Sequence, residues 1–421
     1  MPTIHSKPQL PQEILDLCLA YLRPEQRALA NCLLAGQPLT NSARKILFQI
    51  VKLAVSGDKP HILSRKLTKF SAFWSTSPHL LQYVKSILIE SPSGNTHYEV
   101  LDIFRGQAIQ KIKFQAPRLA RDVGVNNVAR LTEFFMASEV SRLALVDLNL
   151  CGTHTLPIDL LRVLPNLQKL RLNLKKATDE PKFKEAELDP ATLPPELCIT
   201  VPELQLDDDS MSAEAWFLLT RCLDFSYLKR LDITQRWCSS PEVEALRGFF
   251  KKAAPHLEEL SFRPPLHAYA ADTAGSSWNL SGFSQLRKLE FYGRHLDPNP
   301  WLQNWIYHQL IQIPSENQLE EITLDFPFLD LHPERTRVII TRRPEFYYAP
   351  PFNPGERPLR LDQVDEMLNC YTRLDFLLSK LEHLKVLRLV EEGTRKPIQV
   401  FPILSDSGKL VVQPRVNNHM E

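Results

Sequence analysis

The residues most able to do chemistry in this chain are a run of three aspartates, twelve histidines and seven cysteines. Asp207-Asp208-Asp209 could bind a cation or share a proton, but three adjacent carboxylates point in different directions along a chain. The run also precedes Ser210-Met211-Ser212 and a predicted helix, whose first turn carboxylates and hydroxyls would cap. We therefore expect helix capping here rather than a site.

The histidines and cysteines show no spacing typical of a metal or catalytic site. The histidines include no HExxH pair, and the cysteines are an odd number with no CxxC pair, which suits reduced thiols. The chain also lacks the GxSxG turn of a nucleophilic serine and the glycine-rich loops that hold phosphates. We expect no metal, no cofactor and no enzymatic activity.

Composition and charge narrow the classes of partner. The chain has 421 residues and a net charge of +1, so it lacks the positive field that gathers nucleic acid or an anionic membrane. Its first thirty residues lack a secretion signal, and no stretch approaches the roughly 18 consecutive apolar residues of a membrane span. We expect a cytoplasmic or nuclear protein that binds neither nucleic acid nor membrane.

Residues 341–360 have the composition of a binding site, because arginine and aromatic residues gather there between five prolines. Planar side chains dominate binding hot spots, since they give a large contact area at low entropic cost, and proline would hold the loop in order. The alternative is that the aromatic residues only cover the end of a core. The candidate target-binding residues are Arg342, Arg343, Phe346, Tyr347, Tyr348 and Arg357.

Repeats of the pattern apolar-x-x-apolar-x-apolar would position these residues. The last two apolar residues of each copy lie on one face of a strand, because side chains alternate along a strand. Three copies begin at Leu228, Leu257 and Leu286, an even spacing of 29 residues. Other copies begin at Leu167, Leu319 and Leu384, and looser ones at Val84, Ile109, Val140 and Val201. This pattern is typical of a leucine-rich repeat, whose stacked strands share one core.

The repeats predict an α/β fold over residues 56–412. Amphipathic stretches at residues 213–225 and 241–254 predict helices between the strands. We expect a solenoid in the shape of a horseshoe, with a parallel sheet on its concave face, helices on its convex face and a disordered tail at 413–421. The asparagine that the consensus places after each strand is missing, so the solenoid is expected to be irregular.

One interval between repeats is too long for a single repeat. The copies that begin at Leu319 and Leu384 are 65 residues apart, which is about two repeat lengths. Either a degenerate repeat lies between them, with a strand at residues 338–340, or the segment at 341–360 replaces it.

Residues 8–55 do not follow the repeat and predict three short helices. The first opens at Pro11, the second begins at Pro24 and stops at Gly36-Gln37-Pro38, and the third starts near Asn41. A module of this size is marginal without metal or disulfides, so its apolar face must meet a partner. That face consists of Ile14, Leu17, Cys18, Tyr21 and Leu22.

Several segments resemble a known family. Leu10-Pro11-Gln12-Glu13-Ile14 and Leu29-Ala30-Asn31-Cys32-Leu33-Leu34 are similar to the opening and central motifs of the F-box. Ser77-Pro78-His79-Leu80 and Phe401-Pro402 are similar to segments of F-box-like leucine-rich proteins of basidiomycete fungi. Leu39 stands where this family usually has tryptophan, which bears on partner affinity more than on the fold.

This resemblance implies a substrate receptor of an SCF-type cullin-RING ubiquitin ligase. In such a receptor the F-box docks on the Skp-type adaptor, the repeats hold a target protein, and no catalysis takes place on the chain itself. The adaptor-facing residues that the resemblance implies are Leu10, Pro11, Ile14, Leu34 and Leu39. The alternatives are a recognition scaffold without a ligase, in which these residues only pack against the solenoid, or a homotypic contact.

Overall fold

The structure is a computed structural model of the chain. It describes residues 11–23, 25–54, 60–90, 99–115, 125–153, 157–174, 198–208, 212–235, 240–263, 280–292, 300–314, 317–325, 361–391 and 402–414. The chain forms two compact units, Met1–Val201 and Pro202–Glu421, and each unit is described by itself.

The first unit starts with a module of three helices. They are α1 (Gln12–Tyr21), α2 (Gln26–Cys32) and α3 (Gln37–Leu47). Both α1 and α2 pack against α3, and the module has a small core of its own formed by Leu19, Leu29 and Ala43. Leu22, Cys32, Leu33, Leu39, Ile46 and Leu47 pack around this core.

The third helix begins at Gln37, so the expectation of a start near Asn41 is wrong. Pro38 lies in the first turn, where its fixed φ suits a helix and its missing N–H costs no hydrogen bond. Gly36 precedes this turn with a φ of 133°, a backbone conformation that side chains rarely allow. The Gly-Gln-Pro sequence therefore ends one helix and starts the next.

Five parallel strands of the first unit follow one another across the sheet in chain order. They are β1 (Ile50–Ala54), β2 (Ser86–Glu90), β3 (Lys111–Gln115), β4 (Asp147–Thr153) and β5 (Lys169–Leu174). The sheet thus begins at Ile50, inside the range predicted for the helical module. The helices that accompany these strands are α4 (Pro60–Thr76), η1 (Pro78–Tyr83), η3 (Glu99–Phe104), α5 (Val125–Met136), α6 (Glu139–Ala144) and α7 (Ile158–Arg162).

One predicted copy of the repeat is out of register. The copy that supplies β4 is Leu145-x-x-Leu148-x-Leu150, whose three leucines are buried, and not the one predicted to begin at Val140. Val140 instead lies on α6 and is 52% exposed. Ser138 explains the difference, because its hydroxyl accepts the N–H of Ser141 and starts a helix at the point where the repeat was predicted to begin.

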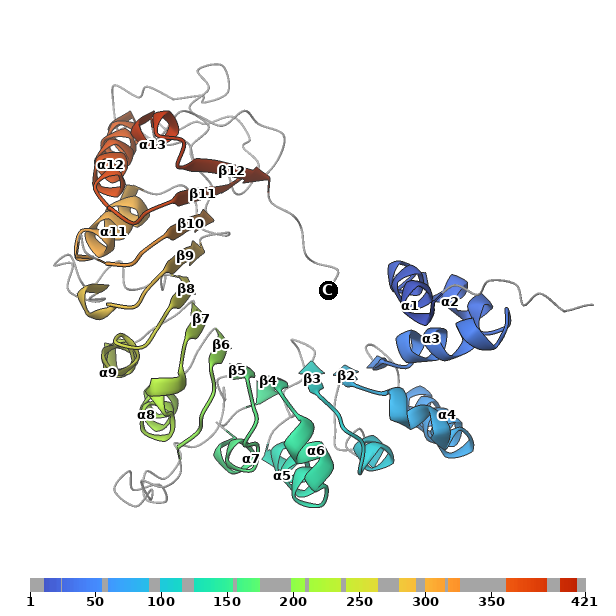
Figure 1. Ribbon diagram of the computed structural model, residues 1–421. Helices are drawn as coiled ribbons and strands as arrows, with labels where there is room; N and C mark the ends of the chain where they lie inside the picture. The colour runs from blue at the N-terminus through green and yellow to red at the C-terminus, as the bar shows by residue number, and fades with distance from the viewer. Residues whose placement is uncertain are drawn as a thin grey trace, which may run out of the picture. The chain divides into compact units, whose positions relative to one another are not determined.

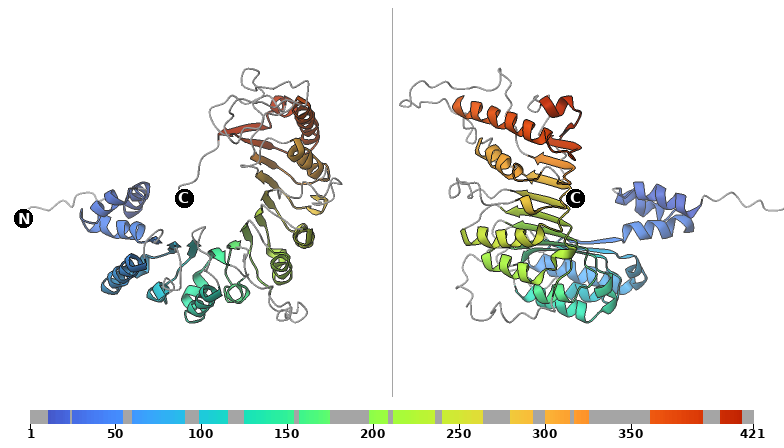
Figure 2. Two further views of the ribbon diagram at one scale, coloured as in Figure 1. Left: turned by 180° about the vertical axis from the view of Figure 1, so that it is seen from behind. Right: turned by 60° about the vertical axis from the view of Figure 1, so that its left-hand side comes forward.

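The second unit repeats the same arrangement over seven parallel strands in chain order. They are β6 (Glu203–Asp208), β7 (Arg230–Gln235), β8 (Glu259–Arg263), β9 (Lys288–Tyr292), β10 (Glu321–Asp325), β11 (Val386–Glu391) and β12 (Leu410–Pro414). The accompanying helices are α8 (Ala213–Cys222), η5 (Phe225–Tyr227), α9 (Ser240–Ala253), η6 (Leu280–Gly282), α11 (Pro300–Leu310), α12 (Leu361–Ser379) and α13 (Pro402–Asp406). Figures 1 and 2 show α8, α9, α11 and α12 together on one side of these strands.

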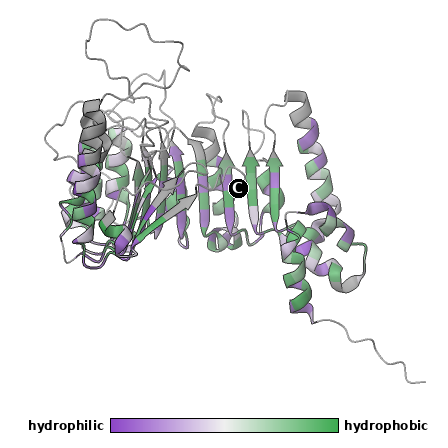
Figure 3. Cartoon of the chain, turned by 90° about the horizontal axis from the view of Figure 1, so that it is seen from above, coloured by the Kyte–Doolittle hydropathy of each residue, from purple (hydrophilic) through white to green (hydrophobic). Residues whose placement is uncertain are grey.

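The expected α/β fold with parallel strands and intervening helices is confirmed. Strand residues alternate between buried apolar side chains and more exposed ones, and Figure 3 shows this as green and purple bands along the strands. The buried residues face the helices, so the opposite face of each sheet, which we call its open face, carries the other set. Rings join neighbouring repeats in the core of the second unit, as in the pairs Phe250–Phe283 and Phe262–Phe291.

The strands at the two ends of the long interval are paired with each other. β10 and β11 are direct neighbours, with Ile322 opposite Leu387 and Leu324 opposite Leu389. The predicted strand at 338–340 lies outside the described residues, and the pairing leaves no place for a strand between the two neighbours. The chain also continues as β12 to Pro414, beyond the predicted start of the tail at 413.

Main-chain hydrogen bonds fix the register where the strands begin. We call the residue just before each strand its corner residue. The carbonyl of a corner residue accepts two N–H groups of the next repeat, as Lys229 O accepts from Glu258 N at 2.9 Å and from Glu259 N at 3.0 Å. The same pair of bonds joins β1 through β5 and β6 through β11. Because the register is the same for each pair of strands, outward side chains at equivalent positions of neighbouring strands lie side by side.

Candidate functional site

Seven residues of the predicted sites lie outside the described residues. They are Leu10 in the adaptor-facing set, and Arg342, Arg343, Phe346, Tyr347, Tyr348 and Arg357 in the target-binding set. The described residues form two other surfaces that could bind a protein, one on α1 and one on the sheet of the second unit.

Helix α1 presents large apolar side chains to solvent. Ile14 is 43% exposed, Leu17 59% and Tyr21 86%, and we call these three residues the α1 face. Their spacing of three and four residues places them along one side of the helix. All three belong to the apolar face predicted from the sequence, whose other members are Cys18, which is exposed, and Leu22, which packs against the module's core. Two further adaptor-facing candidates are exposed as well, namely Pro11 before the helix and Leu34 after α2.

The α1 face is exposed because the helix uses another side to join its module. Leu19 is buried in the small core and Leu22 packs against it, so α1 is apolar on two sides. Leu39 also packs against this core and is half-buried, unlike the other described members of the adaptor-facing set. The sequence suggested one apolar face, whereas the structure separates a core side from an exposed side.

A polar cluster joins α1 to α3. The hydroxyl of Ser42, which is buried, donates to the carboxylate of Asp16, and the amide of Gln12 donates to the same carboxylate at 3.0 Å. These hydrogen bonds, together with Lys45 at 4.0 Å, lower the pKa of Asp16. The carboxylate is thus held ionised between the two helices and fixes the orientation of α1.

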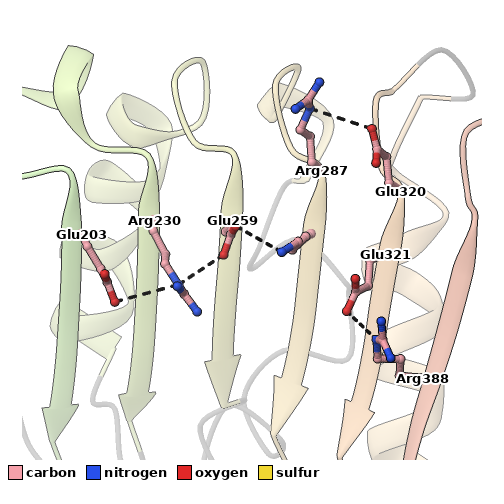
Figure 4. A network of polar contacts seen from close by, with 8 residues as sticks. Glu203, Arg230, Glu259, Arg287, Glu320, Glu321 and Arg388 are labelled. Atoms are coloured by element: carbon pink, nitrogen blue, oxygen red, sulfur yellow. Dashed lines mark hydrogen bonds and ion pairs between the residues drawn. The ribbon is translucent and has the colours of Figure 1, made fainter. Parts of the chain in front are cut away.

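The second surface is an ordered set of charges along the edge where the strands of the second unit begin. Basic and acidic side chains alternate from strand to strand, both among the corner residues and among the first residues of the strands. We call these two rows the charge ladder, and Figure 4 shows most of its members. The corner row is Lys229, Glu258, Arg287, Glu320 and Lys385, and the strand row is Glu203, Arg230, Glu259, Lys288 and Glu321.

Ion pairs run across four strands, β6 to β9, in the strand row. Glu259 forms two ion pairs, with its carboxylate 3.2 Å from Arg230 Nε and 3.4 Å from Lys288 Nζ. Arg230 Nε also lies 4.0 Å from the carboxylate of Glu203. A diagonal pair continues the row, because Arg388 Nε donates to Glu321 at 2.7 Å. Figure 4 shows these contacts lying across neighbouring strands.

The corner row contains a second set of ion pairs. Lys229 Nζ is 3.1 Å from Glu258, and Glu320 lies between Lys385 at 2.9 Å and Arg287 at 4.0 Å. The hydrogen bond from Lys385 lowers the pKa of Glu320, and the charges of Lys385, Arg287 and His383 add to this effect. Exposed ion pairs contribute little to stability, so the ladder orders side chains more than it stabilises the fold.

The ladder suits recognition rather than catalysis. Its carboxylates already have basic partners and lie at a solvent-exposed edge, where general acid or base chemistry lacks a desolvated pocket. A partner would have to match the alternating signs, because each cation lies beside an anion. Among the described residues no group of histidine, cysteine, aspartate and glutamate side chains could hold a metal ion.

The ladder was not predicted, although its signal is in the sequence. Between the first and second apolar positions of four successive repeats stand Lys229-Arg230, Glu258-Glu259, Arg287-Lys288 and Glu320-Glu321. Pairs of one sign therefore alternate with pairs of the other. The alternation becomes visible only when the repeats are aligned and their variable positions are compared.

The three aspartates do not form a separate site among the described residues. Asp207 and Asp208 belong to β6, and Asp209 is not described. The cap of α8 is Ser212, whose hydroxyl accepts the N–H of Ala215 at 3.2 Å. A hydroxyl thus caps this helix, as one part of the prediction has it, whereas Asp207 and Asp208 belong to the strand and do not cap it.

No helix in the described part of the chain is both long and apolar enough to cross a bilayer. Comparison with family models finds no family that matches the chain, and no curated protein matches it. A function for the chain therefore has to be inferred from the surfaces that the structure describes.

Proposed function

We propose that this chain is a target-recognition receptor of an SCF-type cullin-RING ubiquitin ligase. In this proposal the N-terminal helices are an F-box-like module that docks on a Skp-type adaptor, and the repeats form a leucine-rich horseshoe that binds a target protein. The chain itself carries no catalytic step. The observation that supports the proposal best is the exposure of the α1 face on a module that has its own core.

The exposed apolar area is large enough to support a complex. Fully burying a side chain of the size of leucine or isoleucine contributes about 1.5–3 kcal/mol. Burying Ile14, Leu17 and Tyr21 together would therefore contribute several kcal/mol. The costs of association and of ordering side chains offset part of this gain. Contiguous exposed apolar residues of this kind mark interaction surfaces. A buried Ile14 would instead have favoured a module that only caps the repeats.

Co-purification with a Skp-type adaptor tests this proposal. We expect the full chain to bind the adaptor, and both a Pro11→Ala/Ile14→Asp double variant and a Leu17→Asp variant to lose binding. Phe217→Asp is the matched control, because Phe217 is 47% exposed on α8 in the second unit. Binding by the variants, or no binding by the wild-type chain, would contradict the assignment of this surface.

One observation favours a second candidate function. Leu39 packs against the module's core, and the family usually has tryptophan at this position to contact the adaptor, so the adaptor contact could be missing. The chain would then be a recognition scaffold without a link to a ligase. In that case the wild-type chain captures a target but no adaptor.

The segment at 341–360 stays a proposal for target contact. Affinity purification with the full chain identifies the targets, and we expect a Tyr347→Ala/Tyr348→Ala variant to lose them without a change in melting temperature. A lower melting temperature would show that these rings cover the core instead. Comparison with the Pro11→Ala/Ile14→Asp variant separates adaptor-dependent partners from targets.

A further inference from the structure

A further exposed surface of the first unit lies where the chain enters β4. Large apolar side chains are exposed there at the end of α5, on α6 and at the corner before the strand. They are Met136, Val140, Leu143 and Val146, whose exposed fractions are 63%, 52%, 45% and 38%. We call these residues the α6 face. Exposed apolar residues that share one place, unlike single scattered ones, indicate a site of interaction.

Another repeat of the same unit shows this stretch without the apolar face. Residues 74–85 lead into β2 as residues 135–146 lead into β4, and the two segments align without a gap. In this alignment η1 corresponds to α6, and a serine precedes each of the two helices. The inward side chains of both segments are buried, namely Trp74, Leu80 and Val84 in one and Phe135, Ser141 and Leu145 in the other.

The outward positions of the two segments differ in chemistry. Each residue of the α6 face has a polar equivalent before β2, and these equivalents are, in the same order, Ser75, His79, Gln82 and Lys85. Lys85 and Val146 are both corner residues, and the carbonyl of each accepts two N–H groups of the next repeat. The fold therefore does not require apolar side chains at these positions.

Hydrogen bonds hold α6 in place from both sides. The buried hydroxyl of Ser141 donates to the carbonyl of Gln107, in the preceding repeat, at 2.8 Å. The side-chain amide of Asn166, in the following repeat, donates to the carbonyl of Leu143 at 2.8 Å. The α6 face is thus fixed before a partner arrives, so binding does not have to order it.

The charges beside the α6 face are paired within their own helices. Arg142 lies 3.8 Å from the carboxylate of Glu139 on α6, and Arg162 lies 3.1 Å from the carboxylate of Asp159 on α7. Each of these two helices carries one acidic and one basic residue and has no net charge. A partner surface that is apolar and uncharged therefore matches them best.

The size and main chain of this region favour a helical segment as the partner. A stable interface between two proteins takes about 20–30 residues on each side, so the α6 face is too small to hold a second copy of the chain. An extended segment is recognised through its main chain, but β4 is already paired with both β3 and β5. A helix satisfies its own main-chain groups and offers a stripe of apolar side chains.

We propose that the α6 face binds the apolar stripe of an amphipathic helix in a target protein. Val140 and Leu143 stand one turn apart on α6, at the interval that lets side chains of two helices pack between each other. Met136 and Val146 flank them in the chain and enlarge the apolar contact. The inference rests on the proposed function, because it names the kind of target that the repeats would hold.

Fluorescence anisotropy with the full chain and two labelled helical peptides tests this inference. Both peptides contain equal numbers of leucine, glutamate and lysine, so neither has a net charge. The leucines form one stripe in the first peptide and are spread around the helix in the second. We expect the first to bind, with little change between about 0.1 and 0.5 M NaCl, and the second to bind at least about tenfold more weakly. Equal binding of both peptides, or loss of binding at high salt, would overturn the proposal.

Variants that exchange the outward residues locate the binding surface. Val140→His/Leu143→Gln introduces the residues that stand at the equivalent positions before β2, where the same backbone accommodates them. This variant is expected to weaken peptide binding about tenfold, because two side chains lose their apolar contact. Met136→Ser/Val146→Lys makes the same exchange at the other two positions and should also weaken binding. Unchanged binding by both variants would overturn the assignment.

A matched control removes exposed apolar side chains from the second unit. Ile311 and Phe376 are 51% and 55% exposed, and an Ile311→Gln/Phe376→Gln variant should change peptide binding less than about twofold. A larger loss in this control than in the variants of the α6 face would contradict the assignment. Circular dichroism of all variants verifies that they fold.

The α1 face is also apolar, so the peptide test includes the adaptor variant. Pro11→Ala/Ile14→Asp should lose the adaptor and keep the peptide, whereas Val140→His/Leu143→Gln should do the opposite. The reverse result would place the peptide on the α1 face and overturn the proposal. If the wild-type chain binds the peptide but no adaptor, the α6 face stands and the ligase proposal fails. If it binds the adaptor but no peptide, the ligase proposal stands and the α6 face is wrongly assigned.

Discussion

The two units use one backbone pattern to build two different surfaces. At the corner and the first two outward positions, β1 to β5 carry six basic residues and one acidic residue, whereas β6 to β11 carry six basic and seven acidic residues. The number of cations is the same, so the anions make the difference. In the second unit acidic and basic residues alternate in the ladder, whereas the compared positions of the first unit carry one acidic residue, Asp147, which is paired with Lys111.

The comparison also separates what holds the fold from what a partner meets. Buried residues at matching positions are apolar in both units, as Ile112 and Phe114 are in β3 and Leu289 and Phe291 in β9. Differences in function should therefore follow outward positions, while differences in stability should follow inward ones. Five predictions test this division.

The largest effect is expected from the core. Phe114→Ala and Phe291→Ala remove equivalent inward rings from β3 and β9, and each should lower the free energy of unfolding by about 3–5 kcal/mol. Because repeats contact mainly their neighbours, the loss of amide-exchange protection should stay within the unit that carries the change. Urea unfolding and hydrogen exchange measure both quantities. Uniform loss across the chain would show that the units unfold as one.

A buried carboxylate in the second unit should have the next largest effect. Asp375 on α12 is 1% exposed and accepts the N–H groups of Ile403 and Leu404 at 2.8 and 3.1 Å. Asp375→Ala leaves two backbone donors without this acceptor and should cost about 2–3 kcal/mol. Amide exchange in residues 402–414 reports the loss, and the control is Asp406→Ala, at an exposed position of α13. Equal effects of the two variants would contradict this role.

A charge reversal distinguishes the two open faces directly. Glu259→Lys replaces two attractions in the charge ladder by two repulsions and should cost about 1–2 kcal/mol at low salt, with a smaller cost in 1 M NaCl. Lys113→Glu has uncharged neighbours in its row and should change stability by less than about 0.5 kcal/mol. Denaturant unfolding at both salt concentrations measures this. Similar costs for both reversals would mean that the ladder does not depend on alternation.

The smallest effects concern pH. The pKa of Asp16 is lower in the folded module than in the unfolded chain, so the ionised carboxylate stabilises the module above about pH 4, the unfolded value. This contribution is lost as the pH falls through the folded pKa. In an Asp16→Asn variant, the free energy of unfolding should therefore fall less as the pH is lowered from about 5 to 2. An unchanged pH profile would contradict the role of Ser42 and Gln12 as donors.

Glu320 gives a matching test in the second unit. Its pKa is lowered chiefly by the hydrogen bond from Lys385, so Lys385→Met should raise the pKa of Glu320 toward its ordinary value. A carboxylate titration by nuclear magnetic resonance measures the shift. Lys380→Met, at another exposed lysine, should leave the titration unchanged.

The fold was largely predictable because the repeat pattern reports directly on burial. Leu228, Leu231 and Ile233 are buried as their spacing predicts, and so are the corresponding residues of the next two repeats. The prediction failed at Val140, where a serine cap produced a short helix with the same apolar spacing as a strand entry. Local hydrogen bonds of this kind do not change hydrophobic periodicity, so the periodicity could not reveal them.

The surfaces were less predictable because they depend on residues far apart in the chain. The exposure of Ile14 and Leu17 required knowing that Leu19, on another side of α1, forms the core. The pairing of Glu320 with Lys385 spans 65 residues and depends on β10 and β11 being direct neighbours. Both surfaces follow from the strand register and helix packing, which the sequence indicates only indirectly.

The paired bonds at the strand corners have a consequence for how such a surface can change over time. Both donors are main-chain N–H groups, so proline alone is excluded at these positions, and none of the eighteen donor residues is proline although the chain contains 33. Every other side chain leaves the register intact. Substitution at two neighbouring positions can thus change the outward charges of one repeat while the main-chain hydrogen bonds beneath them stay the same.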